Sequence, residues 1–147
     1  MEAYSKNDKY FRIKQIVAGV FILGLIYWFQ SRPVEIPQES VQRIRNLSPG
    51  LVHNLIIQNE GRKEFVVLDV RTQEEYGLGH LEGSKLLDFY RKDFSEQLSS
   101  LDRSGTYVLY CRSGNRSGKV LAQMKQLGFK EVYHIKGGYL AWKESGY

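Results

Sequence analysis

Residues 106–128 read TYVLYCRSGNRSGKVLAQMKQLG. The run TYVLY is short, continuous and largely apolar, which is typical of a strand buried on both faces of a parallel sheet. From Ser117 onward apolar residues recur at helical spacing, and Gly128 follows in the position where helices commonly end. The side chains expected to face inward are Val120, Leu121, Met124 and Leu127. The stretch therefore predicts a strand and a helix joined by a polar loop that begins at Cys111.

The same alternation of apolar runs and amphipathic stretches continues on both sides of this unit. Ser48 and Pro49 provide an N-cap and a first helical residue, and Thr72 to Glu75 form a capping box that opens a short helix. The further elements expected are helices at 50–59, 93–101 and 139–145, and strands at 65–70, 85–89 and 131–135. Strands that alternate with helices predict a three-layer α/β fold with a mostly parallel central sheet.

The N-terminal part of the chain has a different composition. Residues 1–12 form a basic tail, and the segment 13–30 is largely apolar with aromatic residues at its end. Such a segment predicts an uncleaved transmembrane signal anchor, which would make the membrane a partner of this chain. A cleaved signal peptide is the alternative, although no small-residue cleavage site follows. Residues 31–45, with two prolines, are expected to link this anchor to a domain at 46–147.

The basic residues around this segment predict its orientation. Lys6, Lys9, Arg12 and Lys14 come before or at its start, whereas only Arg32 follows closely. By the positive-inside rule, the N-terminus is expected in the cytoplasm. The domain is then expected outside the cytoplasm, in the periplasm or at the cell surface.

The charge balance of the chain excludes one class of partner. Lys and Arg outnumber Asp and Glu by 21 to 16, and beyond the N-terminal tail the excess is small. This argues against a nucleic-acid-binding platform and suits a small anionic ligand. The single cysteine excludes an intramolecular disulfide, and the sequence indicates neither a metal site nor a cofactor.

Cys111 lies where the chain can make a thiol reactive. Ligand sites in parallel α/β folds form beyond the C-terminal ends of the strands, and Cys111 directly follows a predicted strand. Gly114 and Asn115 tolerate positive φ, so several backbone N–H groups can point toward one atom, and the next helix adds its positive end. Arg112 and Arg116 add positive charge. We therefore expect a thiolate nucleophile that needs no adjacent base, rather than a buried structural thiol.

Three segments carry a resemblance to a known family: LDVRTQEEYGLGHLEG at 68–83, YVLYCRSGNRSGKVLAQMKQLGF at 107–129 and VYHIKGGYLAW at 132–142. From about Leu47 to the C-terminus, the chain resembles a single rhodanese domain. The resemblance implies a five-stranded parallel sheet flanked by helices. It also implies sulfurtransferase activity, in which the cysteine takes a sulfane sulfur from an anionic donor such as thiosulfate and holds it as a persulfide. The sulfur then passes to cyanide or a thiol.

Matched position by position, Cys111 is the implied persulfide carrier. The implied substrate-binding residues follow it: Arg112, Ser113, Gly114, Asn115, Arg116 and Ser117. Their amides would surround the sulfur, and the two arginines are candidates for anion recognition. Asp69 and Arg71 match the family's D-V-R element and are expected to form a supporting ion pair. His80 matches the family's G-H element, where a turn-stabilising role is favoured over that of a general base.

One segment departs from the usual pattern of the family. After Gly79 and His80 the family commonly has isoleucine, proline, glycine and alanine, whereas residues 81–86 of this chain read LEGSKL. Because this segment usually borders the site, the charges beside it differ here from the common arrangement.

Three other functions stay open. Cysteine phosphatases and arsenate reductases place an arginine six positions after the cysteine, whereas Arg116 stands five positions after Cys111 and Ser117 stands sixth. The shorter spacing favours a cradle for a sulfur atom over one for a tetrahedral oxyanion. A docking module of the same fold typically lacks the cysteine, which this chain keeps. A sulfur carrier fed by a protein persulfide would have to pass its sulfur to an external acceptor, because no second cysteine exists.

Overall fold

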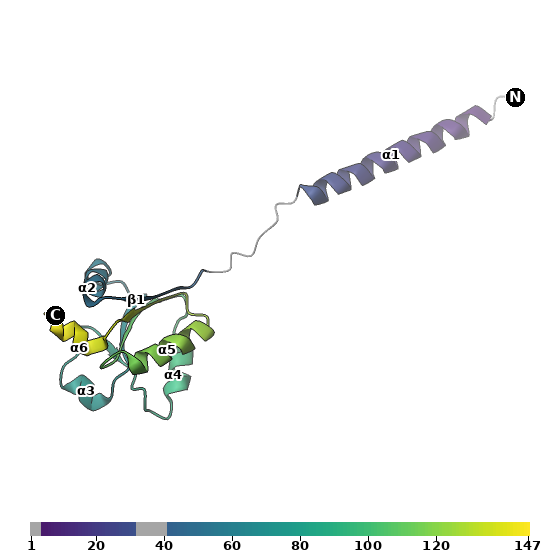
Figure 1. Ribbon diagram of the computed structural model, residues 1–147. Helices are drawn as coiled ribbons and strands as arrows, with labels where there is room; N and C mark the ends of the chain where they lie inside the picture. Colours follow the sequence, from purple (N-terminus) through teal and green to yellow (C-terminus); the bar gives the residue numbers. More distant parts are fainter. Residues whose placement is uncertain (1–3, 32–40) are drawn as a thin grey trace. The chain divides into compact units, whose positions relative to one another are not determined.

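The structure, a computed structural model, describes residues 4–31 and 41–147. The chain divides into two units, Met1–Gln38 and Glu39–Tyr147. In the first unit the described residues form the helix α1 (Tyr4–Gln30), so most of the expected basic tail is helical (Figure 1). Residues 1–3 of that tail and 32–40 of the expected linker lie outside the described residues.

The transmembrane anchor predicted at 13–30 is not supported by the structure. No helix in 4–31 or 41–147 is long and apolar enough to cross a bilayer, α1 included. A span needs about 20 consecutive, predominantly apolar residues. The uncharged part of α1 runs only from Gln15 to Gln30 and has a glutamine at each end. The extracytoplasmic location inferred from the flanking charges stays a prediction.

The second unit contains a five-stranded sheet in the order β1-β5-β4-β2-β3. Its strands are β1 (Arg43–Leu47), β2 (Phe65–Asp69), β3 (Lys85–Leu86), β4 (Thr106–Tyr110) and β5 (Glu131–Ile135). Every pairing between neighbours is parallel. The prediction of a parallel α/β fold is therefore confirmed, and β2, β4 and β5 lie where the apolar runs placed them.

The two edge strands differ from the sequence expectation. β1 begins inside the segment expected to be a linker, and its residues Arg43, Arg45 and Asn46 are exposed. No apolar run marks such a strand, because an edge strand with one solvated face need not be apolar. At the other edge, β3 is only Lys85–Leu86, shorter than the strand expected at 85–89.

Helices alternate with the strands, and α2 and α3 begin where their capping signals placed them. They are α2 (Pro49–Gln58), α3 (Gln73–Gly77), α4 (Phe94–Ser100), α5 (Asn115–Gln126) and α6 (Gly138–Glu144). The capping box of α3 is present. The Glu75 N–H donates to Thr72 Oγ1 at 3.3 Å, and the Thr72 N–H donates to Glu75 Oε2 at 3.0 Å. α5 begins at Asn115, two residues before the expected Ser117.

Each face of the sheet buries its own apolar cluster, because successive strand residues point to opposite sides. On one face, Tyr107, Leu109 and Cys111 belong to the cluster that contains Val120 and Met124 of α5 and Phe94 and Leu98 of α4. On the other, Val108 and Tyr110 belong to the cluster that contains Val52 of α2 and Trp142 of α6. Figure 1 shows α4 and α5 on one side of the sheet and α2 and α6 on the other. The alternation directs Cys111 toward α5.

Candidate active site

Cys111 follows β4 directly and lies at the C-terminal edge of the sheet. Its side chain is buried, with 1% exposure, and its sulfur accepts two hydrogen bonds. The Gly114 N–H donates to Sγ at 3.1 Å, and the Ser117 hydroxyl donates to Sγ at 3.2 Å. Gly114 has φ 99°, a left-handed conformation that glycine adopts without strain, so the backbone can fold back onto the sulfur.

The surroundings of the sulfur favour its charged form. Burial raises the pKa of the Cys111 thiol, but the Ser117 hydroxyl and the backbone amides of Ser117, Gly114 and Ser113 outweigh it, and the pKa is lowered. The first turn of α5 adds the positive end of the helix dipole. Cys111 therefore has the environment of a reactive cysteine rather than of a structural one.

The start of α6 supports this loop from the other side of the sheet. The Tyr139 N–H donates to the Cys111 carbonyl at 2.8 Å, and the Leu140 N–H donates to the Arg112 carbonyl at 3.0 Å. Gly138 makes this approach possible, since its φ is 65° and a Cβ at this position would collide with the Cys111 carbonyl oxygen. The turn at Gly137 and Gly138 therefore also supports the cysteine loop.

The two arginines of the loop have different environments. Arg116 forms a bidentate pair with Glu75, at 2.6 Å from Nη1 to Oε2 and 2.7 Å from Nη2 to Oε1. Its guanidinium also lies 5.7 Å from the Tyr90 ring centre. Arg112 is exposed, as are Ser113 and Asn115. Of the two candidates for anion recognition, Arg112 is therefore the one open to solvent, whereas Arg116 holds the loop to α3.

The ion pair expected between Asp69 and Arg71 is present and buried. Arg71 Nη2 lies 2.7 Å from Asp69 Oδ2, and the two side chains are 3% and 0% exposed. Burial disfavours the charge on Arg71, but Asp69 outweighs it and raises the pKa of Arg71. The guanidinium also donates to the Gly79 carbonyl at 2.7 Å and lies 4.1 Å from the Tyr139 ring centre. Because the Tyr139 N–H donates to the Cys111 carbonyl, the Asp69–Arg71 ion pair supports the cysteine loop through Tyr139.

His80 is placed with α3 rather than with the sulfur. Its ring stacks on Tyr76 at 3.8 Å between ring centres, and its Nδ1 lies 3.0 Å from the Tyr76 carbonyl. The side chain is exposed. These are the contacts of the turn-stabilising residue that the sequence favoured over a general base.

The departing segment 81–86 is tied to the end of β4. The Leu81 N–H donates to Tyr110 Oη at 3.2 Å, and the Ser84 hydroxyl lies 3.2 Å from the same oxygen. Leu81 and Ser84 are buried, whereas Glu82 and Lys85 are exposed. The segment therefore keeps its structural contacts and differs in its exposed charges.

Two polar residues near the sulfur were not identified from the sequence. His134 Nε2 lies 2.8 Å from the Ser117 hydroxyl oxygen, and His134 Nδ1 lies 2.8 Å from Asn46 Oδ1. His134 is 8% exposed, and Asn46 lies on β1 beside it. The histidine between Tyr133 and Ile135, near the end of the predicted strand EVYHI, was a signal, because a buried polar side chain requires a partner.

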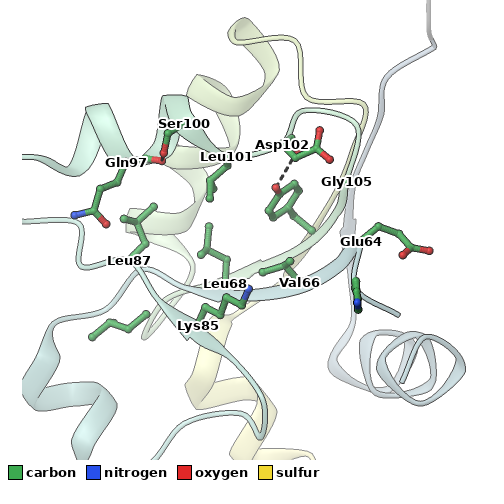
Figure 2. A pocket seen from close by; sticks show the side chains of 13 residues that line it. Glu64, Val66, Leu68, Lys85, Leu87, Gln97, Ser100, Leu101, Asp102 and Gly105 are labelled. Atoms are coloured by element: carbon green, nitrogen blue, oxygen red, sulfur yellow. Dashed lines mark hydrogen bonds between the residues drawn. The ribbon is translucent and has the colours of Figure 1, made fainter. Parts of the chain in front are cut away.

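The pocket drawn in Figure 2 lies away from this site. It is lined by Val66 and Leu68 of β2, by Lys85 and Leu87, by Gln97, Ser100 and Leu101 at α4, and by Gly105 and Tyr107 at the start of β4. Cys111 follows the opposite end of β4, so this pocket does not include the cysteine loop. Among the described residues, no group of three or more His, Cys, Asp or Glu side chains could hold a metal ion.

Comparison with known proteins adds to this geometry. The family model of the Rhodanese-like domain matches residues 51–145. Thiosulfate sulfurtransferase 16, chloroplastic, of Arabidopsis thaliana is 37% identical over 111 residues, which cover 69% of this chain and 88% of that protein. The probable adenylyltransferase/sulfurtransferase MoeZ of Mycobacterium tuberculosis is 37% identical over 84 residues, which cover 57% of this chain and 21% of that protein. The chain thus spans about a fifth of the mycobacterial relative.

A solved structure shows the same fold. The crystal structure of a rhodanese-related protein from Thermoplasma volcanium has a TM-score of 0.57 and 28% identity, with 70% of this chain and 94% of that chain covered.

Proposed function

This chain belongs to the rhodanese-like domain family, and from that membership and the geometry of its cysteine loop we propose that it is a sulfurtransferase. Cys111 takes a sulfane sulfur from thiosulfate or a persulfide donor and passes it to cyanide or a thiol. The observation that carries the proposal is the position of Cys111 Sγ, which accepts hydrogen bonds from Gly114 and Ser117 at the C-terminal edge of a parallel sheet.

The proposed first step is a displacement at sulfur. The Cys111 thiolate attacks the sulfane sulfur of thiosulfate, the new Cys–S bond forms, and the sulfur–sulfur bond of thiosulfate breaks. Sulfite leaves with the electron pair of that bond, and a persulfide anion stays on Cys111. The loop amides that favour the thiolate also suit the negative charge of the outer sulfur.

The proposed second step returns the enzyme to its first state. Cyanide or a thiolate attacks the outer sulfur of the persulfide, and the bond between the two sulfurs breaks. Its electron pair returns to Cys111 as the thiolate. No resolving cysteine is available within this chain, so the acceptor is external.

The alternative function, that of a cysteine phosphatase, has less support than sulfur transfer. A tetrahedral oxyanion is commonly bound by an arginine that is free to form two hydrogen bonds with it. In this chain Arg116 forms both such bonds with Glu75 instead. We therefore expect no turnover of an aryl phosphate.

The test is sulfur loading of the full chain. Incubation with thiosulfate should add the mass of one sulfur atom to Cys111, and cyanide should remove it with formation of thiocyanate. The Cys111→Ser variant should give neither result, whereas Ser95→Ala, a change at an exposed serine of α4 outside the cysteine loop, should still be loaded. Equal thiocyanate production by wild type and Cys111→Ser would end the proposal. Absence of an adduct with both thiosulfate and a persulfide donor would favour a docking module.

A further inference from the structure

A line of hydrogen-bonding side chains runs from the buried sulfur to the edge of the sheet. Ser117 Oγ lies 3.2 Å from Cys111 Sγ, His134 Nε2 lies 2.8 Å from the same oxygen, and Asn46 Oδ1 lies 2.8 Å from His134 Nδ1. Cys111 and His134 are 1% and 8% exposed, whereas Asn46 is exposed on the edge strand β1. The line therefore joins a thiol that bulk water hardly reaches to a solvated residue.

The Ser117 hydroxyl can donate only one hydrogen bond, which limits the hydrogen-bonding arrangements open to these side chains. The Ser117 hydroxyl has one proton but three neighbours that could accept it: Cys111 Sγ, the Gly114 carbonyl at 3.2 Å, and His134 Nε2. If Nε2 accepts the proton, the sulfur loses this donor. If Nε2 carries its own proton, it donates to Ser117, and the hydroxyl is then free to donate to the sulfur.

The partner of His134 Nδ1 decides which protonation state of the ring is compatible with each direction of the Ser117 hydroxyl proton. Nδ1 faces the amide oxygen of Asn46, which can only accept, so Nδ1 carries a proton in the arrangement found here. A neutral ring then has a bare Nε2 that draws the hydroxyl of Ser117 away from the sulfur. A ring protonated on both nitrogens donates to Asn46 and to Ser117, and Ser117 donates to the sulfur.

From this geometry we propose that His134 is a positioning residue that receives the proton of the Cys111 thiol through Ser117. The S–H proton moves to Ser117 Oγ while the hydroxyl proton moves to His134 Nε2, so that a thiol and a neutral imidazole become a thiolate and an imidazolium. No net charge is gained or lost. Asn46 accepts from Nδ1 and stabilises the imidazolium. This inference rests on the proposed function and deepens it, and it differs from the expectation that the thiolate needs no base.

The ionisation of the Cys111 thiol and that of the His134 imidazole depend on each other. Burial lowers the pKa of His134, with a smaller opposing effect of the Gly114 backbone, so the imidazolium depends on the thiolate for its stability. On α5, the Arg116 guanidinium interacts electrostatically with Cys111 and is paired with Glu75. Lys119 of the same helix is exposed. In the loops Arg112 and Lys136 are exposed. Strand alternation directs Arg43, Arg45 and Glu131 toward the other face.

The first experiment measures the rate of Cys111 alkylation by iodoacetamide from about pH 5 to about pH 10 in the full chain, because alkylation follows the thiolate. In His134→Gln an amide can still donate to Ser117 but takes up no proton. We expect its midpoint to rise by about one pH unit, and its rate near neutral pH to fall about tenfold. His53→Gln, a change at the histidine that stacks on Tyr147, is the matched control and should keep the wild-type profile.

A second variant and a second measurement keep the proposal testable if His134→Gln unfolds. Asn46→Ala, at the exposed edge, should shift the alkylation midpoint in the same direction by a smaller amount. In histidine NMR, Cys111→Ser should lower the pH at which His134 loses its proton, since coupling between two sites is reciprocal. A midpoint unchanged in folded His134→Gln, or a His134 titration that is the same with and without Cys111, would overturn the relay. Neither measurement needs sulfur transfer, so a relay that holds in a chain without sulfur loading would reject the proposed function alone.

Discussion

Arg116 of the cysteine loop and Glu75 of α3 are joined by two hydrogen bonds, of 2.6 and 2.7 Å. Glu75 Oε2 also accepts the Thr72 N–H of the capping box, so one carboxylate stabilises the start of α3 and holds the loop that follows β4. The pair is partly buried, with side-chain exposures of 16% for Arg116 and 25% for Glu75. The loop is thereby fixed by a residue that lies outside it.

The first prediction concerns the stability of this connection. Glu75→Ala removes the reciprocal contact of the capping box and leaves Arg116 without its carboxylate. We expect the free energy of unfolding to fall by about 1–2 kcal/mol, as measured by urea denaturation. Glu82→Ala, at an exposed glutamate, is the control and should change it by no more than about 0.5 kcal/mol. Indistinguishable unfolding curves for the two variants would show that the pair contributes little.

The second prediction is the pH dependence of the same connection. The hydrogen bonds from Arg116, assisted by the Thr72 amide against the opposing effect of burial, lower the pKa of Glu75 from 4.5 to about 2. A lowered carboxyl pKa stabilises the fold fully above the unfolded-state value of 4.5, and this contribution is lost as the pH falls toward about 2. The difference in unfolding free energy between wild type and Glu75→Gln should therefore shrink over this interval. A difference that stays constant from neutral pH all the way down to about pH 2 would contradict the assignment.

The third prediction concerns the glycine beneath the loop. In Gly138→Ala the new Cβ meets the carbonyl oxygens of Cys111 and Arg112, the latter at 2.7 Å, and the residue has φ 65°. We expect a loss of about 3 kcal/mol or more in the free energy of unfolding. Gly61→Ala is the matched control, since Gly61 has φ 78° but nothing within 4 Å of an added Cβ. It should lose only about 1 kcal/mol, the cost of the left-handed backbone. Equal losses in thermal or urea unfolding would mean that the collision is relieved by movement.

The fourth prediction concerns the buried ion pair. Arg71→Met leaves the carboxylate of Asp69, which is fully buried, without its partner. We expect a loss of about 3–5 kcal/mol in urea unfolding. The double variant Asp69→Asn with Arg71→Met removes the uncompensated charge and should recover part of that loss. A double variant as unstable as the sum of the two single variants would indicate that the two residues do not act as a pair.

The fifth prediction concerns the anionic donor. Arg112 is the exposed arginine of the loop, so Arg112→Ala should raise the KM for thiosulfate several-fold with less effect on kcat. The difference should diminish as salt is added, because exposed charges are screened. Lys119→Ala, a charge change at an exposed position one turn into α5, is the control. An unchanged KM in steady-state thiocyanate assays would remove Arg112 from the recognition of the donor.

Local patterns account for the elements of the fold that the sequence predicted correctly. The apolar runs at 65–70 and 106–110, the capping box from Thr72 to Glu75 and the helical spacing after Ser117 each involve residues near in sequence. β1 escaped prediction because its exposed residues lack such a pattern, and it becomes a strand only by pairing with β5. The apolar segment at the N-terminus predicted a membrane span that the helix α1 does not support.

The cysteine loop was predictable for a similar reason, since its function depends on neighbouring residues. Gly114 and Ser117 reach the sulfur from three and six positions away, a reach set by one turn and the start of a helix. The partner of Arg116 was not predictable, because Glu75 is 41 positions away. Whether an arginine in the loop binds a ligand or a carboxylate of its own chain depends on how the fold places Glu75 of α3 within reach of the start of α5.

The sequence by itself determined the order of the strands and helices after β1, the position of Cys111 after a buried strand, and the donors that lie within the same turn. It could do so because hydrophobic period, capping and loop spacing act over a few residues. Only the tertiary structure decided that Arg116 is paired with Glu75. It also decided that His134 contacts the Ser117 hydroxyl and that Asn46 contacts His134. The parallel pairing of β1 with β5 brings Asn46 and His134 together across 88 positions of sequence. Strand order and register bring such residues together, and no local pattern specifies them.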